Sequence, residues 1–217
     1  MGENSSSSPP PATTTTDPTT TTPAPAITLP SSISTTPISN LPQYHRFITT
    51  HNPAGEAIVH SHTPFTWAAY DNENLAFAVP YTTSTFPADL NADADLVTHD
   101  RVIASGTLGL VNPRGTVLRC VDFAPGYACG MHRTQSLDYG IVMEGAVDMV
   151  LDSGEVHSLK RGDVAVQRAT QHQWVNRSAT EWARMMFVLQ DCQPLVVGGV
   201  EMGEDLGTNS GLPPSGN

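Results

Sequence analysis

The sequence predicts an all-β domain, a sandwich or a barrel, preceded by a segment that does not fold. Three observations carry this prediction. Short runs rich in β-branched and aromatic residues recur at intervals of about 8–12 residues. Glycine-bearing turns such as Asp152-Ser-Gly154 separate the runs. The first forty residues, by contrast, have no apolar period of any kind.

The segment 1–40 is expected to be a disordered, Ser/Thr/Pro-rich N-terminal tail. Of its 40 residues, 27 are Ser, Thr or Pro and none is aromatic. Such a composition cannot bury enough apolar surface to offset the backbone entropy that folding removes. Both an inert solvated tail and a docking or modified segment remain open. The Gly- and Pro-rich end, 207–217, is also expected to be flexible, which leaves 41–206 as the folded domain.

Within the folded domain, eight runs have the composition of strands, and turn residues separate them. The alternation of Ala, Asp and Leu in 88–105 predicts either a short acidic helix or a loop. The expected strands are 75–79, 115–123, 139–144, 147–151, 156–159, 164–167, 172–175 and 185–189.

Charge and composition exclude two classes of partner. The chain has 10 basic and 21 acidic side chains and a formal net charge of −11. Nucleic acids and anionic membrane surfaces are bound by clustered Lys and Arg, so neither is expected as a partner. No apolar run approaches the roughly 20 residues that span a bilayer. Three cysteines without Cys-x-x-Cys spacing, and no secretory signal, predict a reduced cytoplasmic location.

One stretch carries an unusual polar face. Residues 132, 134, 136 and 138 share parity, so on an extended strand their side chains point to one side. These residues are His132, Thr134, Ser136 and Asp138. Four polar side chains in a row between hydrophobic strands fit the lining of a cavity better than a solvated edge.

The spacing of this stretch resembles the first motif of the cupin superfamily, G-x5-H-x-H-x(3,4)-E-x6-G. The chain has Gly126, His132, Thr134, Asp138 and Gly145 at the corresponding positions. All spacings hold, but threonine replaces the second histidine and aspartate replaces the glutamate. The resemblance implies a single cupin β-barrel of the jelly-roll type.

A second stretch resembles the other cupin motif, G-x5-P-x-G-x2-H-x3-N. It runs from Gly162 to His172 and Asn176, with one interval shortened by a residue. Gln167 stands in place of the proline and Ala169 in place of a glycine.

The strings at 131–140 and 166–176 are similar to those of small single-domain cupin proteins of fungi that accompany polyketide synthases. That resemblance implies a role in secondary-metabolite biosynthesis, with oxidoreduction of an aromatic polyketide as the first expectation. Other proteins of the wider group act as decarboxylases, isomerases or cyclases, so the resemblance implies a pathway context more firmly than a reaction.

The motif residues predict a site for one divalent metal ion. His132 and His172 are expected as catalytic residues and metal ligands, and Asp138 as a third that instead could pair with Arg133. Two imidazoles and one carboxylate are the ligand set of non-haem iron sites, so Fe(II) is favoured, while Zn, Mn and Ni also suit the donors. Without a metal, either histidine could act as a general base.

Four further residues are expected to bind substrate. Thr134 is a weak metal donor and is expected to line the cavity. Trp174 shares parity with His172 and should face inward, either as core or as a stacking surface for substrate. Gln167 could hydrogen-bond the substrate or a ligand. Arg168 could bind a substrate carboxylate, although a solvated surface position is the simpler alternative.

The sequence therefore predicts a metal-dependent oxidoreductase that modifies a small oxygenated, hydrophobic molecule. The alternatives are a redox-neutral decarboxylase, dehydratase, isomerase or cyclase, and a non-catalytic binding protein, which the Thr134 replacement favours. Cupins commonly pair, so a homodimer is expected, with 41–85 as the source of an exchanged edge strand.

Overall fold

The all-β prediction is confirmed in the computed structural model, which describes residues 1, 32–207 and 212–216. All eight expected strands form, several of them longer than expected, and 88–105 contains a helix. In chain order the elements are β1 (Ser32–Ser34), β2 (His45–His51), β3 (Ala57–Pro64), β4 (Trp67–Tyr70), β5 (Leu75–Thr83), η1 (Asn91–Asp93), α1 (Ala94–Ser105), β6 (Thr116–Phe123), β7 (Ser136–Glu144), β8 (Ala146–Leu151), β9 (Val156–Lys160), β10 (Val164–Arg168), β11 (His172–Val175), β12 (Ala183–Asp191), β13 (Val196–Val197) and β14 (Val200–Glu201).

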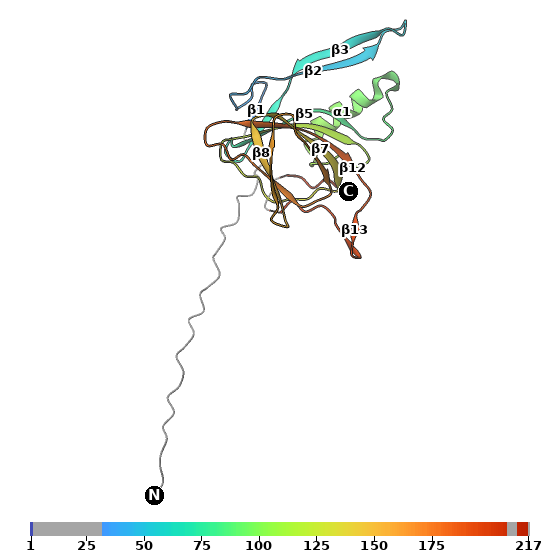
Figure 1. Cartoon of the computed structure of the whole chain (residues 1–217). Coiled ribbons are helices and arrows are strands. Elements are labelled where there is room, and N and C mark those ends of the chain that lie inside the picture. Colours follow the sequence, from blue (N-terminus) through green and yellow to red (C-terminus); the bar gives the residue numbers. More distant parts are fainter. Residues whose placement is uncertain (2–31, 208–211, 217) are drawn as a thin grey trace.

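Two antiparallel sheets face each other and enclose the core (Figure 1). The larger sheet has the order β1-β4-β5-β6-β12-β7-β10, and the smaller one has the order β11-β8-β9. The rings of Trp174 on β11 and Phe187 on β12 meet with centroids 5.6 Å apart, which closes the space between the sheets. The predicted turn Asp152-Ser-Gly154 joins β8 to β9, and Gly154 takes a φ of 89°, which glycine adopts without strain.

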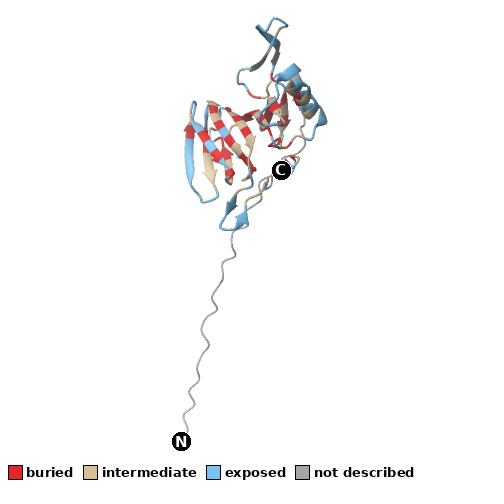
Figure 2. Cartoon of the chain, turned by 90° about the vertical axis from the view of Figure 1, so that its right-hand side faces the viewer, coloured by how far each residue is buried: buried red, intermediate tan, exposed pale blue. Residues whose placement is uncertain are grey.

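The alternation of side chains along β6 divides the core into two parts. Val117, Val121 and Phe123 point between the two sheets and join the main apolar cluster. Cys120 points to the other face of the larger sheet and packs in a second cluster with Trp67. Figure 2 shows buried residues along the strands of the barrel, with pale, exposed surface on α1 and on the hairpin β2–β3.

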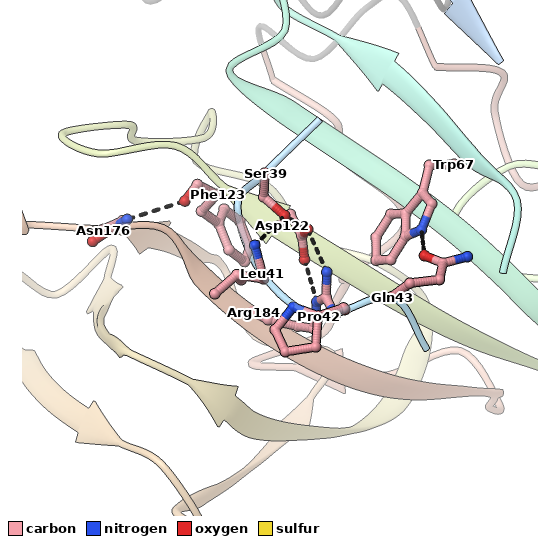
Figure 3. A network of polar contacts seen from close by, with 9 residues as sticks. All are labelled: Ser39, Leu41, Pro42, Gln43, Trp67, Asp122, Phe123, Asn176 and Arg184. Atoms are coloured by element: carbon pink, nitrogen blue, oxygen red, sulfur yellow. Dashed lines mark hydrogen bonds and ion pairs between the residues drawn. The ribbon is translucent and has the colours of Figure 1, made fainter. Parts of the chain in front are cut away.

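The chain before residue 41 belongs to the folded unit from Ser32 onward, so the expected tail boundary does not hold for 32–40. β1 pairs with β4, and Ser39 is buried with its hydroxyl donating to Asp122. Arg184 forms two hydrogen bonds with the same carboxylate, at 2.6 and 2.7 Å, and donates to the carbonyl of Pro42 (Figure 3). The reason is the buried Asp122–Arg184 pair, whose remaining lone pairs and N–H groups need partners that this segment supplies. The remainder of the expected tail, 2–31, lies outside the described residues.

The expected flexible end, 207–217, also contains packed residues. Leu212 and Ser215 are buried, and the Ser215 hydroxyl donates to Glu204 while accepting from the N–H of Val111. A Cβ on Gly109 would lie 2.8 Å from the Ser215 Cα, so only glycine permits this close approach. Residues 208–211 and 217 lie outside the described part of the chain.

The hairpin β2–β3 extends away from the barrel beside α1 (Figure 1). Its anchor is Arg46, which donates to the carbonyl of Pro80 and lies 3.1 Å from the Nε2 of His99 on α1. Phe47 on this hairpin is 62% exposed and stacks on His62. Within the described residues, no helix has the length and apolar character that crossing a membrane requires.

Candidate active site

A small cavity between the two sheets is lined mainly by apolar side chains. Its volume is about 60 Å³, room for a few atoms of a ligand beyond the walls. Its polar lining consists of two histidines, a threonine, an aspartate and an arginine, and a few polar groups in an apolar pocket are typical of a ligand-binding site. The lining residues are Leu75, Phe77, Leu110, Arg119, Val121, Phe123, Cys129, His132, Thr134, Asp138, His172, Trp174, Phe187, Leu189 and Leu212.

His132 and His172 are brought together by direct backbone pairing. Each donates its N–H to the carbonyl of the other at 2.9 Å, as an antiparallel bridge between the segment before β7 and the start of β11. Residues directly opposite in such a pair project to the same side. The two imidazole rings accordingly lie with centroids 4.4 Å apart.

Hydrogen bonds fix the tautomer of both rings. The Nδ1 of His132 lies 2.9 Å from the carbonyl oxygen of Gly130, and the Nδ1 of His172 lies 2.9 Å from that of Thr170. A carbonyl oxygen only accepts, so each Nδ1 carries the proton and each Nε2 keeps its lone pair. No described residue bonds to either Nε2. The pair therefore presents two free acceptor nitrogens to a ligand.

Burial keeps both rings neutral. It lowers the pKa of His132, against the smaller raising effect of its bond to Gly130. For His172, burial and then the neighbouring His132 lower the pKa to about 3. Neutral imidazole is the form that binds a metal ion or accepts a proton.

Thr134, Ser136 and Asp138 form a buried hydrogen-bonded row, as their shared parity predicts. The Ser136 hydroxyl donates to the Thr134 hydroxyl at 2.8 Å, and Thr134 donates to the Asp138 Oδ2 at 3.4 Å. The other carboxylate oxygen, Oδ1, is buried and has no hydrogen-bond partner among the described residues. Burial raises the pKa of Asp138 to about 6, because Ser136 and Thr134 compensate only part of the lost hydration.

Trp174 faces inward on β11, as its parity with His172 predicts. Its ring meets the His172 ring edge-on, with centroids 5.5 Å apart, and also contacts Phe187. Cys129 lines the cavity as a buried thiol, and burial raises its pKa to about 12. A thiol held protonated in this way is a wall of the cavity and not a nucleophile.

Two of the expected substrate-binding residues lie outside the cavity. Gln167 is buried, but its amide donates to the Met149 sulfur and accepts from Thr170. Arg168, the next residue of β10, is exposed on the opposite face of the strand. Arg133 also has a structural contact, since its Nε donates to the carbonyl of Gly203 and it forms no ion pair with Asp138.

The structure adds one polar residue that the motif comparison did not suggest, Arg119 on β6. It lines the cavity and is 6% exposed. In the sequence, Arg119 shares odd numbering with Val117, Val121 and Phe123, so on a strand it points to the same side as they do. A charged residue in such an apolar series is the signal that could have identified it.

The donors fit a metal ion in part. His132 and His172 supply two neutral nitrogens, and Asp138, which lines the same cavity, has a carboxylate oxygen with no partner among the described residues. Among the described residues, however, no three His, Cys, Asp or Glu side chains converge as a ligand group. The imidazole pair alone is therefore the candidate protein ligand set, and Asp138 lies beside it.

Comparison with known sequences places the chain among fungal biosynthetic proteins, although no family model matches it. It is 44% identical over 164 residues to the phomopsin biosynthesis cluster protein D of Diaporthe leptostromiformis, covering 73% of this chain and 84% of the relative. It is 40% identical over 173 residues to the oryzines biosynthesis cluster protein J of Aspergillus oryzae, covering 79% and 96%. It is 37% identical over 181 residues to the cupin-domain-containing oxidoreductase virC of Hypocrea virens, covering 82% and 91%.

A solved structure of a Cupin 2 conserved barrel domain protein from Salinispora arenicola is also similar. It shares 28% identity, with a TM-score of 0.33, and the match covers 36% of this chain and 64% of that one. The sequence relatives are the stronger finding, because they align over most of both chains. The spacing of His132, Asp138 and His172, the two facing sheets and these relatives agree: the chain belongs to the cupin-domain proteins encoded in fungal biosynthesis clusters.

Proposed function

We propose that this protein is a tailoring oxidoreductase of fungal secondary metabolism. It holds one divalent metal ion through His132 and His172, and Fe(II) is the favoured ion. The observation that carries the proposal is the imidazole pair, with both Nδ1 protons bonded to carbonyls and both Nε2 atoms free. Relatives named cupin-domain-containing oxidoreductases, such as virC of Hypocrea virens, support the reaction class.

The residues around the pair supply the rest of the proposed site. A bound divalent ion would polarise an oxygen of the substrate or activate O₂. Apolar walls, among them Phe187, Leu189 and Trp174, exclude water and strengthen the electrostatic interactions inside the cavity. A small, oxygenated and largely apolar molecule, such as a polyketide intermediate, matches this lining.

A redox-neutral reaction is the second candidate, and one observation favours it. Among the described residues, Asp138 does not join the two histidines in a three-residue ligand group; it lines their cavity, and its Oδ1 has no partner there. A buried carboxyl group so placed beside a neutral imidazole is positioned to exchange a proton with a substrate. Decarboxylation, dehydration, isomerisation and cyclisation all require this kind of step.

Metal analysis of the full-length protein, purified without oxygen, separates the two candidates. We expect about one iron per chain in the wild type, and loss of the metal in both His132→Ala and His172→Ala. His157→Ala is the matched control, because His157 is exposed on β9, and it should keep the metal. Wild type with no more metal than the histidine variants would contradict the metal proposal and favour the redox-neutral reaction.

Metabolite profiling tests whether the protein is an enzyme at all. A strain lacking it should accumulate a precursor, and His132→Ala should fail to restore the product while His157→Ala restores it. An unchanged profile in the deletion strain would contradict both catalytic candidates and leave a binding protein.

A further inference from the structure

Arg119 occupies a position that packing alone does not explain. It lies on the inner face of β6, between Val117 and Val121, and its pairing partner on β12 is Phe187. Its side chain reaches the same cavity as His132 and His172. A guanidinium group among apolar side chains is costly unless its charge and its N–H groups are matched.

The described residues do not match this charge with a charge of opposite sign. The Nη2 of Arg119 donates to the carbonyl of Gly109 at 2.8 Å, and the guanidinium lies 5.0 Å from the centre of the Phe77 ring. Its Nε is buried with no hydrogen-bond partner. No carboxylate of the described residues lies within ion-pair distance.

A second arginine of the same strand pair has a guanidinium whose charge and N–H groups are matched by a carboxylate. Arg184, on β12, is fully buried and forms two hydrogen bonds with Asp122, which lies directly opposite on β6. Both arginines are buried, but among the described residues only Arg184 has a carboxylate partner. The difference indicates that Arg119 is held for a carboxylate that the described part of the chain does not supply.

The location of Arg119 is open to a ligand. Arg119, Phe77 and Leu212 line the inner cavity and also a neighbouring cleft of about 290 Å³. The guanidinium therefore stands at the boundary between the two spaces. Burial lowers its pKa only to about 10, so it stays charged at neutral pH.

We propose that Arg119 is a substrate-binding residue that holds a carboxylate, so that the substrate is a small carboxylic acid with an apolar body. This assignment rests on the proposed function, because the cavity is the same one. A guanidinium offers a planar fork of donors that matches a carboxylate. Among the described lining residues, Arg119 is the one positively charged side chain, and it can neutralise one negative charge. A phosphate dianion would keep an unpaired charge in apolar surroundings.

Titration calorimetry with benzoate and its neutral isostere benzamide tests the assignment on the full-length protein. We expect benzoate to bind about tenfold tighter or more, because charge-assisted hydrogen bonds are roughly twice as strong as neutral ones. Arg119→Met keeps an unbranched aliphatic stem without the guanidinium and should remove the preference. Arg168→Met is the matched control on the exposed face of β10 and should keep it.

A further variant separates this assignment from the proposed function. Benzoate could also bind to a metal ion, so His132→Ala should keep the preference for benzoate while losing metal and activity. Equal affinity of the wild type for both probes, or no binding at millimolar concentration, would overturn the assignment, as would a preference that survives Arg119→Met. If the methionine variant does not fold, Arg119→Gln replaces it. The comparison of benzoate with benzamide on the wild type remains a test of the assignment in either case.

Discussion

Single side chains in this protein owe their properties mainly to burial. His132 and His172 are neutral because the barrel removes their hydration, and their proton stays on Nδ1 because a backbone carbonyl lies two residues before each of them. Both motifs therefore contain the same local hydrogen bond, from the histidine Nδ1 to the carbonyl two residues before it. The site is set by two local hydrogen bonds and by one cross-strand pairing.

His99 is a further buried histidine, on α1, and it predicts a pH dependence of stability. Its Nδ1 lies 3.0 Å from the Thr82 hydroxyl, and its Nε2 lies 3.1 Å from an Nη1 of Arg46. Burial and then the positive Arg46 lower its pKa below the ordinary 6.5. The unfolded chain therefore binds a proton at higher pH than the folded chain does, and the free energy of unfolding should decrease as pH falls below 6.5.

The measurement is urea unfolding of wild type and His99→Gln between neutral and mildly acidic pH. The decrease of stability should be shallower in the variant, by at most about 1.4 kcal/mol per pH unit for one histidine. His157→Gln, at an exposed position on β9, is the control and should follow the wild type. An identical slope for wild type and His99→Gln would refute the role of this histidine.

At the scale of elements, β6 and β12 organise both faces of the larger sheet. Their inward residues line the cavity, and their outward pair, Asp122 and Arg184, fastens the chain around Ser39 and Pro42 (Figure 3). Arg184 also lies over the rings of Tyr44 and Trp67, at 4.4 and 4.7 Å from their centres. One buried ion pair thus anchors the segment around Ser39 and Pro42, which leads into the barrel.

Removing one partner of this pair should destabilise the protein strongly. Asp122→Ala leaves a buried, unpaired guanidinium, and we expect a loss of about 3–5 kcal/mol in the free energy of unfolding. The double variant Asp122→Leu with Arg184→Met removes both charges and should lose less. Urea unfolding measures each value.

The matched control is the surface pair of Arg177 and Asp148, in which the arginine side chain is 64% exposed. Arg177→Ala should cost no more than about 1 kcal/mol. If Asp122→Ala costs no more than this control, the Asp122–Arg184 pair does not hold the N-terminal segment.

At the scale of the whole molecule, the hairpin β2–β3 forms a separate two-stranded sheet that is not part of the two sheets around the core. It extends from the body, and Phe47, Ile58 and Val59 on it are 62%, 44% and 57% exposed. Apolar side chains gathered on a projecting hairpin indicate a contact surface. We expect the hairpin to pack on a second copy of the chain.

Light scattering coupled to gel filtration checks this expectation. The wild type should have twice the mass of the 23.1 kDa chain. Phe47→Glu combined with Val59→Lys should return it to the mass of one chain. Val156→Lys, on exposed β9, is the control and should stay paired. A wild type that runs as a single chain would contradict the role of the hairpin.

The sequence by itself determined the fold class, the positions of eight strands and the inward face at 132–138. These are local properties, because the two-residue period of a strand decides which side chains share a face. That His132 and His172 belong to one site was implied by the resemblance to the two cupin motifs, and their direct backbone pairing was seen only in the structure. The tail boundary could not be predicted, since composition alone does not reveal that Asp122 and Arg184 need the segment at 39–42.

Only the tertiary structure decided which inward residues meet. Gln167 shares a buried face but bonds to Met149 and Thr170, whereas Arg119, which lies outside both motifs, shares the cavity with His132 and His172. The strand order β6-β12-β7 and its register set these neighbours. The physical reason is that parity is fixed within one strand, whereas the groups that face each other across a barrel depend on pairing between strands distant in sequence.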